Sequence, residues 1–147
     1  MKLCRPRYGS RGITLTEILI SLAITSLTAG VMVSSYVLSA RSADWIAHSA
    51  AADICAQTRM EQTRVAKWDT QAAPTVDELV GTNFPAEPVV LSMPVAGASP
   101  IYATNLTTIT VVSDNPPLKM VRVDCVWRYQ NRGLFTNTAV TYRGADQ

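Results

Sequence analysis

The chain has 147 residues, of which 48% are hydrophobic and 16% are charged, and its net charge is +2. A chain of this length can hold one domain, or one domain and a membrane anchor. Four of the 13 basic residues precede residue 12, so the rest of the chain carries nine basic and 11 acidic residues, a net charge of −2. This balance argues against a basic surface for nucleic acid, and we expect no nucleic acid among the partners.

The first 40 residues have the charge pattern of a membrane anchor. Residues 1–12 form a short basic segment, and Ile18–Ala40 are 23 residues without a charge. Such a run is long enough to cross a bilayer, because a spanning helix needs about 20 apolar residues. Positively charged flanks stay on the cytoplasmic side, so whatever follows the span is expected to face outward.

A single long helix is predicted from Ile13 to about Lys67, because this stretch has no proline and only one glycine, Gly30. It would measure roughly 80 Å at 1.5 Å per residue. Residues 13–40 are apolar all round and form the transmembrane and assembly half, whereas residues 41–67 are amphipathic and should dock on the rest of the chain. The docking face is predicted to hold Ala40, Ala47, Ala51, Ile54, Cys55, Thr58, Gln62 and Val65, with Asp53, Met60 and Arg64 on the other side.

Residues 68–106 are predicted to form a proline-rich connector. Seven of the eight prolines lie between Pro74 and Pro117, and proline interrupts regular structure. Within the connector, Thr75 is a candidate N-cap for a short helical turn through Leu79.

Residues 107–147 have the pattern of an antiparallel sheet. The β-branched run Thr107–Val112 ends at Asp114-Asn115-Pro116-Pro117. Apolar residues at positions 121, 123, 125, 127 and 129 then alternate with polar ones, as in a half-buried strand. Asn131-Arg132-Gly133 should turn that strand back onto Leu134–Tyr142. The expected fold class is α+β: a long N-terminal helix whose second half packs on a small antiparallel sheet.

Side chains suited to catalysis or metal binding are scarce. The chain has one histidine, three cysteines and no C-x-x-C pair, so we expect no metal site and no cofactor. His48 has Asp44 and Ser49 nearby, but without a setting for a nucleophile we interpret it as part of a solvated helix face. We expect no enzyme. Four arginines are interpreted as a solvated sheet face: Arg122, Arg128, Arg132 and Arg143.

The most specific motif is Gly12-Ile13-Thr14-Leu15-Thr16-Glu17, in which a glutamate follows a glycine by five positions at the start of the apolar run. Behind a short basic leader, it resembles the processing site of type IV pilins and of the pseudopilins of type II secretion. The resemblance covers residues 1 to about 40. Ile13 stands where phenylalanine is usual and Thr16 where an aliphatic residue is usual, and neither adds a charge.

The resemblance implies that a prepilin peptidase cuts after Gly12 and that Ile13 becomes the N-methylated N-terminus. Glu17 would then meet the N-terminal ammonium of a neighbouring subunit. A lone carboxylate in hydrocarbon is penalised, and an opposite charge offsets part of the penalty. The implied partners are other pilin or pseudopilin subunits, the peptidase and the inner-membrane assembly platform. The implied location is the inner membrane, crossed once, with the C-terminal head in the periplasm.

The head suggests a minor rather than a major subunit. Its Val-x-Val-x-Cys-x-Trp strand, followed by a glycine hairpin and a last strand, looks like that of I-type minor pseudopilins and V-type minor pilins. Four alternatives stay open: a membrane-anchored periplasmic module that captures a substrate or DNA without assembling, an ordinary signal-anchored protein, a protein with a cleaved secretory signal, and an enzyme with a signal anchor. The residue inventory argues against the enzyme, and the apolar run is longer than the core of a secretory signal.

Cys55 and Cys125 are a candidate disulfide. Cleavage after Gly12 would remove Cys4 and leave this pair outside the membrane, where disulfides persist. Each lies on a face expected to pack against the other, and packed faces can bring Cα atoms within roughly 4.4–6.8 Å. The closed loop of about 70 residues would contribute roughly 4 kcal/mol by a chain-entropy estimate. The alternative is two free cysteines that pack as small hydrophobes.

Overall fold

The computed structural model describes residues 12–93, 99–129 and 132–146. The leader up to Arg11, including Cys4, and the predicted turn residue Asn131 lie outside the described residues. The chain divides into two compact units, Met1–Ser42 and Ala43–Gln147, and each is described by itself.

One unbroken helix, α1 (Leu15–Val65, 51 residues), contributes to both units. The sequence predicted a helix from Ile13 to about Lys67, so each bound lies within two residues of the prediction. The absence of proline explains the continuity, because a proline inside the helix would remove a backbone hydrogen bond. The prediction of a single long helix is confirmed.

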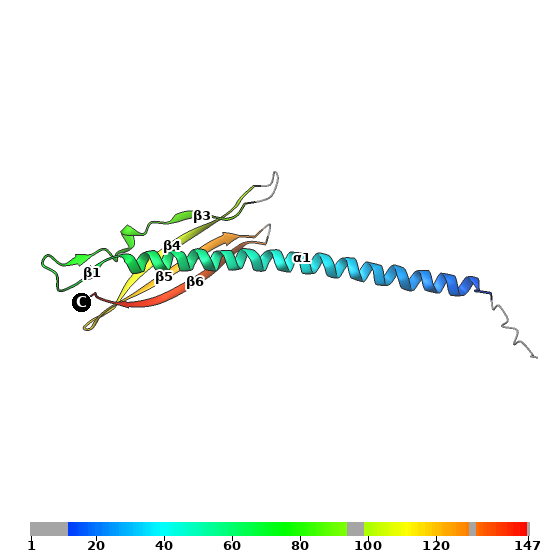
Figure 1. Ribbon diagram of the computed structural model, residues 1–147, viewed down its shortest axis with the longest axis horizontal. Coiled ribbons are helices and arrows are strands. Elements are labelled where there is room, and N and C mark those ends of the chain that lie inside the picture. The colour runs from blue at the N-terminus through cyan, green and yellow to red at the C-terminus, as the bar shows by residue number, and fades with distance from the viewer. Residues whose placement is uncertain (1–11, 94–98, 130–131, 147) are drawn as a thin grey trace, which may run out of the picture. The chain divides into compact units, whose positions relative to one another are not determined.

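Four antiparallel strands form the sheet of the second unit, in the order β3-β4-β5-β6. The strands lie beside the part of α1 that belongs to the same unit (Figure 1). Their bounds are β3 (Glu87–Ser92), β4 (Ile101–Asp114), β5 (Pro117–Arg128) and β6 (Leu134–Gly144). The α+β class predicted from the sequence, with the helix packed on a small antiparallel sheet, is confirmed.

Two tight connections set the register of this sheet. The β4–β5 hairpin turns at Asn115 and Pro116, where the sequence predicted a break, and Asp114 pairs with Pro117. The β5–β6 hairpin pairs Arg128 with Leu134, and Gly133 has a φ of 109°. Only glycine adopts such a backbone conformation without strain, which explains the glycine at this turn.

The connector contains more strand than the sequence predicted. A two-stranded sheet of β1 (Trp68–Asp69) and β2 (Val76–Asp77) is followed by a short 3-10 helix, η1 (Gly81–Asn83). The helical turn predicted from Thr75 to Leu79 is therefore wrong. β3 lies within the predicted connector, and β4 begins at Ile101 rather than at Thr107. Proline was the misleading signal, because β3 is an edge strand and an edge strand tolerates Pro88.

The core lies between β5 and the second half of α1. The alternation predicted for β5 is confirmed, since Val121, Val123, Cys125 and Trp127 are at most 1% exposed. Large side chains on the sheet require small ones on the helix, and Ala52 and Ala56 are at most 1% exposed. This complementarity positions the helix on the sheet.

The predicted docking face of α1 is wrong. The face that packs on the sheet is rotated about the helix axis relative to the predicted one. The buried helix residues are His48, Ala52, Ala56, Arg59, Met60 and Thr63, whereas the predicted Ala40, Ala47, Ile54, Thr58, Gln62 and Val65 are exposed. Met60, assigned to the outer side, is in the core. The prediction followed apolar residues, but the buried stripe includes polar side chains that find partners in the sheet and the connector.

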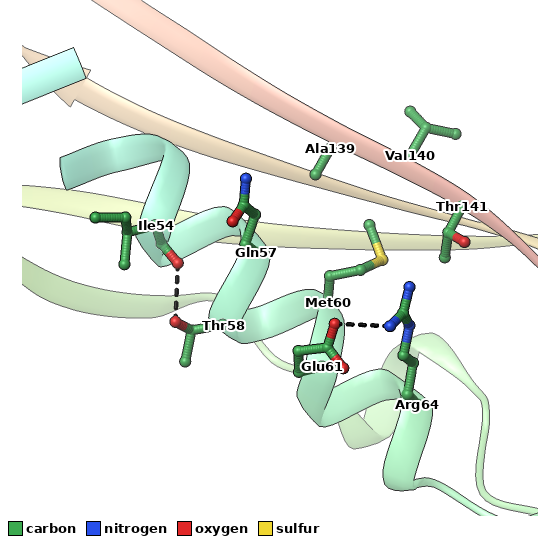
Figure 2. A pocket seen from close by; sticks show the side chains of 9 residues that line it. All are labelled: Ile54, Gln57, Thr58, Met60, Glu61, Arg64, Ala139, Val140 and Thr141. Carbon is green, nitrogen blue, oxygen red and sulfur yellow. Dashed lines mark hydrogen bonds and ion pairs between the residues drawn. The ribbon is translucent and has the colours of Figure 1, made fainter. Parts of the chain in front are cut away.

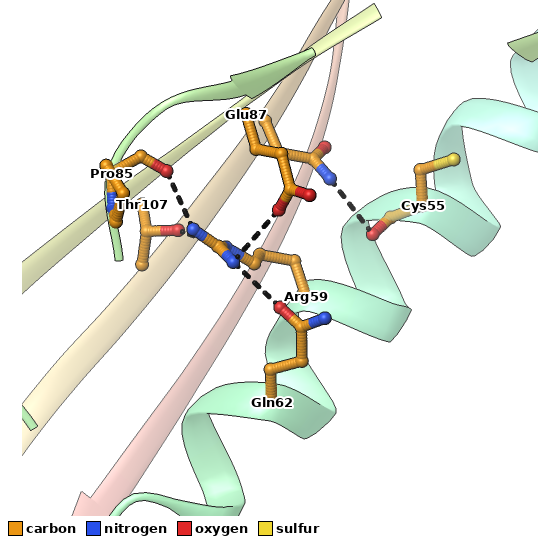
Figure 3. A network of polar contacts seen from close by, with 7 residues as sticks. Cys55, Arg59, Gln62, Pro85, Glu87 and Thr107 are labelled. Atoms are coloured by element: carbon orange, nitrogen blue, oxygen red, sulfur yellow. Dashed lines mark hydrogen bonds and ion pairs between the residues drawn. The ribbon is translucent and has the colours of Figure 1, made fainter. Parts of the chain in front are cut away.

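Arg59 is the clearest case of a buried polar side chain that holds the head together (Figure 3). It is 8% exposed, and its guanidinium lies 5.5 Å from the centre of the Phe84 ring. It donates hydrogen bonds to Thr107 Oγ1 (3.3 Å), Gln62 Oε1 (2.8 Å), Glu87 Oε2 (3.3 Å) and the Pro85 carbonyl (2.7 Å). One side chain thus links the helix to the connector and to strands β3 and β4.

The residues after β6 and the end of β6 itself are joined to the last turn of α1 and to the start of the connector. Arg143, predicted to lie on a solvated sheet face, instead donates from Nη1 to the carbonyl of Thr63 at 2.7 Å and from Nη2 to Asp146 Oδ1 at 2.9 Å. It therefore satisfies a carbonyl in the last turn of α1. The Trp68 N–H, bonded to Asp146 Oδ2 at 2.9 Å, lowers the pKa of Asp146, and Arg143 lowers it further.

Replacing Arg59 with methionine should lower the free energy of unfolding by about 2 kcal/mol, because the hydrogen bonds from this buried guanidinium to four acceptors are lost. Urea unfolding of the full chain in detergent micelles measures this loss. The matched control is Arg64→Met, which removes only an exposed ion pair with Glu61 and should cost less than about 1 kcal/mol. Equal losses for the two variants would contradict the role of Arg59.

Candidate functional site at the start of the helix

The helix begins with a reciprocal cap between Thr14 and Glu17. The Thr14 N–H donates to Glu17 Oε2 at 3.0 Å, and the Thr14 hydroxyl donates to the same oxygen at 3.1 Å. In return, the Glu17 N–H lies 3.4 Å from Thr14 Oγ1. This is the capping-box arrangement of a threonine followed three residues later by a glutamate. The Thr-x-x-Glu signal is present in the sequence, but the prediction gave Glu17 only an intermolecular role and missed the cap.

The cap satisfies only one side of the Glu17 carboxylate. Both contacts from Thr14 go to Oε2, and within the described residues no donor reaches Oε1. Glu17 and Ile13 line the same shallow depression, which has a volume of about 360 Å³. The structure therefore brings two of the predicted site residues onto one side of the chain.

Gly12 precedes the helix in an open position. A Cβ atom added there would meet no atom within 4 Å. Ile13 is 75% exposed. Nothing within the described chain thus requires a glycine at position 12.

The helix that follows is apolar and uncovered. Every described residue from Gly12 to Ala47 is exposed. Of the described residues, only α1 forms a helix long and apolar enough to cross a membrane, with a mean hydropathy of 1.9 over its most apolar window. Hydroxyl groups in this half are compatible with hydrocarbon because they bond to carbonyls one turn back, as in Ser21 to Glu17 (2.7 Å) and Ser34 to Gly30 (2.9 Å).

Cys55 and Cys125 come from facing elements, as expected, but the structure has both as free thiols, so the predicted disulfide is not formed in it. The rotation of α1 puts Cys55 half-buried at the border of the buried stripe rather than at its centre. Burial raises the pKa of the Cys125 thiol to about 11, with smaller contributions from Cys55 and Asp53. Burial also raises the pKa of Cys55.

His48 is buried rather than part of a solvated helix face. It is 7% exposed and stacks on Trp127 with ring centres 6.1 Å apart. Its Nδ1–H donates to the Asp44 carbonyl at 2.7 Å, and the Tyr129 hydroxyl donates to Asp44 Oδ2 at 3.0 Å. Ser49 accepts instead from Asn137. These contacts join helix to sheet and do not align a nucleophile with His48.

Metal-binding groups are likewise not assembled. Within the described ranges, no three His, Cys, Asp or Glu side chains are placed to hold a metal ion.

Comparison of the chain with protein-family models, with curated proteins and with solved structures finds no match. Any assignment of this protein to a class must therefore be argued from its own residues.

The state of the two head cysteines can be tested through their reactivity. In a Cys4→Ser chain purified without reductant, we expect two thiols after denaturation. In the folded chain at pH 8, Cys125 should react far more slowly than Cys55, because a pKa of about 11 leaves little of the reactive thiolate at Cys125. Its rate should rise as the pH approaches 11. Mass spectrometry after timed alkylation measures both rates, and the absence of thiols after denaturation would show that the disulfide forms after all.

Proposed function

We propose that this chain is a structural subunit of a helical filament rooted in the inner membrane, either a minor pseudopilin of type II secretion or a minor pilin. The observation that carries the proposal is the motif Gly12 to Glu17 at the start of an exposed apolar helix whose other half carries a small folded head. A peptidase and an assembly platform in the same membrane are the further partners of this proposal.

The exposed apolar surface supports assembly. Apolar surface left in water is unfavourable by about 25 cal/mol per Å². Leu15, Leu22, Leu27 and Met32 are each at least 66% exposed, so lipid must cover them before assembly and neighbouring helices can cover them afterwards. A membrane-anchored module without partners would need only the lipid, and would use the carboxylate of Glu17 only for the cap with Thr14.

Glu17 supplies a directional contact between subunits. Its Oε1 is the oxygen left available by the cap, and an N-terminal ammonium of a neighbouring chain can donate to it. Because a charge in hydrocarbon is costly without a partner, this contact favours one axial register between helices over others. The cap on Oε2 holds the carboxylate in place for that contact.

The basic leader supports one orientation of the chain in the membrane. Residues 1–12 carry four basic residues and no acidic residue, which favours retention on the cytoplasmic side. The head, residues 43–147, would then lie in the periplasm. Cleavage after Gly12 takes place on the cytoplasmic side and leaves Ile13 as the new N-terminus.

Charge and cap at Glu17 can be separated with two variants. Glu17→Gln keeps an acceptor for the Thr14 N–H but removes the charge, whereas Glu17→Ala removes both. We expect both variants to be processed and inserted but to enter filaments much less than the wild type. The fraction of tagged chain recovered in sheared filaments measures incorporation.

The pattern across the two variants decides the role of the residue. Normal incorporation of Glu17→Gln with loss for Glu17→Ala would assign Glu17 to the cap alone. Full incorporation of both variants would contradict any role for Glu17 in assembly.

Gly12→Trp should block cleavage, because the peptidase must approach the backbone closely at the scissile bond. The space around Gly12 is open, so the substitution leaves the chain itself undisturbed. The uncut chain, longer by 12 residues, should accumulate in the membrane and be visible by immunoblot. Normal processing of this variant would count against Gly12 as the cleavage site.

A further inference from the structure

Charge is unevenly distributed along the head. The far end, where α1 ends and β4 turns into β5, comprises residues 61–78, 114–119 and 143–146, with four basic and six acidic residues. The near end comprises residues 43–48, 128–129 and 132–135. It holds Arg128 and Arg132 against one acidic residue, Asp44. An anionic surface would therefore attract the near end of the head and repel the far end.

The near end is one surface, because contacts join its pieces. Trp45 of α1 packs edge-on against Phe135 of β6, with the ring centres 6.1 Å apart. Leu134, the neighbour of Phe135, pairs with Arg128 at the end of β5. Arg132 lies two residues before Leu134 in the connection between these strands. The first turns of the head helix and the β5–β6 connection thus present their side chains together.

The two arginines of the near end are available for an external anion. Arg128 and Arg132 are exposed, and neither forms an ion pair within the part of the chain that the structure describes. The nearby carboxylate of Asp44 is already engaged, because it accepts a hydrogen bond from the Tyr129 hydroxyl at 3.0 Å and lies 3.6 Å from His48 Nδ1. A guanidinium without a partner is well suited to bind a phosphate group.

Apolar side chains accompany these cations. Trp45 is 38% exposed, Ile46 is 58% exposed and Leu134 is 66% exposed. Tryptophan is enriched where a membrane meets water, because its ring is apolar and its N–H is polar. Exposed apolar and aromatic side chains beside unpaired arginines fit a surface that is both apolar and anionic, and a bilayer of anionic phospholipids is such a surface.

The chain itself brings the near end to a bilayer. The uncharged run Ile18–Ala40 ends five residues before Trp45, which is about 8 Å along the continuous helix α1. The polar headgroup layer on each side of the hydrocarbon core is roughly 5–8 Å thick. A chain that spans the membrane with this run therefore places Trp45 at the depth of the headgroups.

We propose that the near end of the head binds the anionic phospholipid headgroups of the bilayer that α1 spans. Arg128 and Arg132 bind the phosphate groups, and Trp45, Ile46 and Leu134 cover their apolar surface in the headgroup layer. This inference rests on the membrane anchor and not on filament assembly. It gives an unassembled subunit a head that is held on the membrane.

The test uses the full chain, labelled with ¹⁵N, in nanodiscs that contain a small fraction of lipid spin-labelled at the headgroup. The remaining lipid is either anionic phosphatidylglycerol or zwitterionic phosphatidylcholine. We expect the amide signals of Leu134 and Phe135 to be broadened about twofold more in the anionic discs, because docking brings them closer to the spin labels. Amide signals of the far end should show no such difference.

Two matched double variants locate the charges responsible. Each basic residue near an anionic surface contributes about a fivefold preference for it, so Arg128→Gln with Arg132→Gln should lower the ratio of docked to undocked heads roughly 25-fold. The difference between the two lipids should then disappear. The control, Arg64→Gln with Arg122→Gln, removes the same charge from arginines that already pair with a carboxylate, as Figure 2 shows for Arg64 and Glu61, and should keep the difference.

The dispersion of the head amide signals checks that both double variants fold. Equal broadening in the two lipids, or equal loss in the two double variants, would overturn the docking surface. Broadening of the far end that also depends on lipid charge would reveal a general attraction and would overturn it as well. None of these outcomes bears on the proposed function, because processing and incorporation of the Glu17 variants test assembly separately.

Discussion

The uncovered apolar surface at the start of α1 is the constraint on which the other features of this protein depend. Side chains such as Leu22 and Leu27 have no cover within the described chain, and water is an unfavourable solvent for them. They need lipid or the helices of other chains. In such surroundings the single carboxylate of Glu17 requires donors, and the cap from Thr14 provides them to only one of its two oxygens.

The second half of the same helix needs no cover from lipid or from other chains, because the sheet of its own chain covers it. Small residues, Ala52 and Ala56, allow the helix to approach the large side chains of β5, and Trp127 lies at the centre of that contact. Polar side chains then fix the position of the helix along the sheet. Arg59 bonds to the connector and β4, and Asn137 of β6 reaches Asp53 at 2.8 Å. The head is therefore a small folded unit that polar contacts stabilise together with its core.

Much of this architecture could be predicted from the sequence, for physical reasons that act locally. The lack of proline predicted α1, alternation predicted β5, and Gly133 marked the hairpin. Contacts across the fold could not be predicted in the same way. The buried stripe of α1 was misplaced because burial of His48 and Arg59 depends on partners far away in the chain. At the candidate site, the roles of Gly12, Ile13 and Glu17 stay predictions from the resemblance of their motif, and the cap by Thr14 was missed.

The mature N-terminus tests the central claim most directly, because processing precedes every later step of assembly. Top-down mass spectrometry of the chain extracted from membranes determines it without any variant. We predict a chain that lacks residues 1–12, begins at Ile13 and carries one methyl group on its terminal nitrogen. A chain that keeps Met1 and the leader would contradict this claim and would indicate a plain membrane anchor. A chain cut at another position would contradict the claim as well.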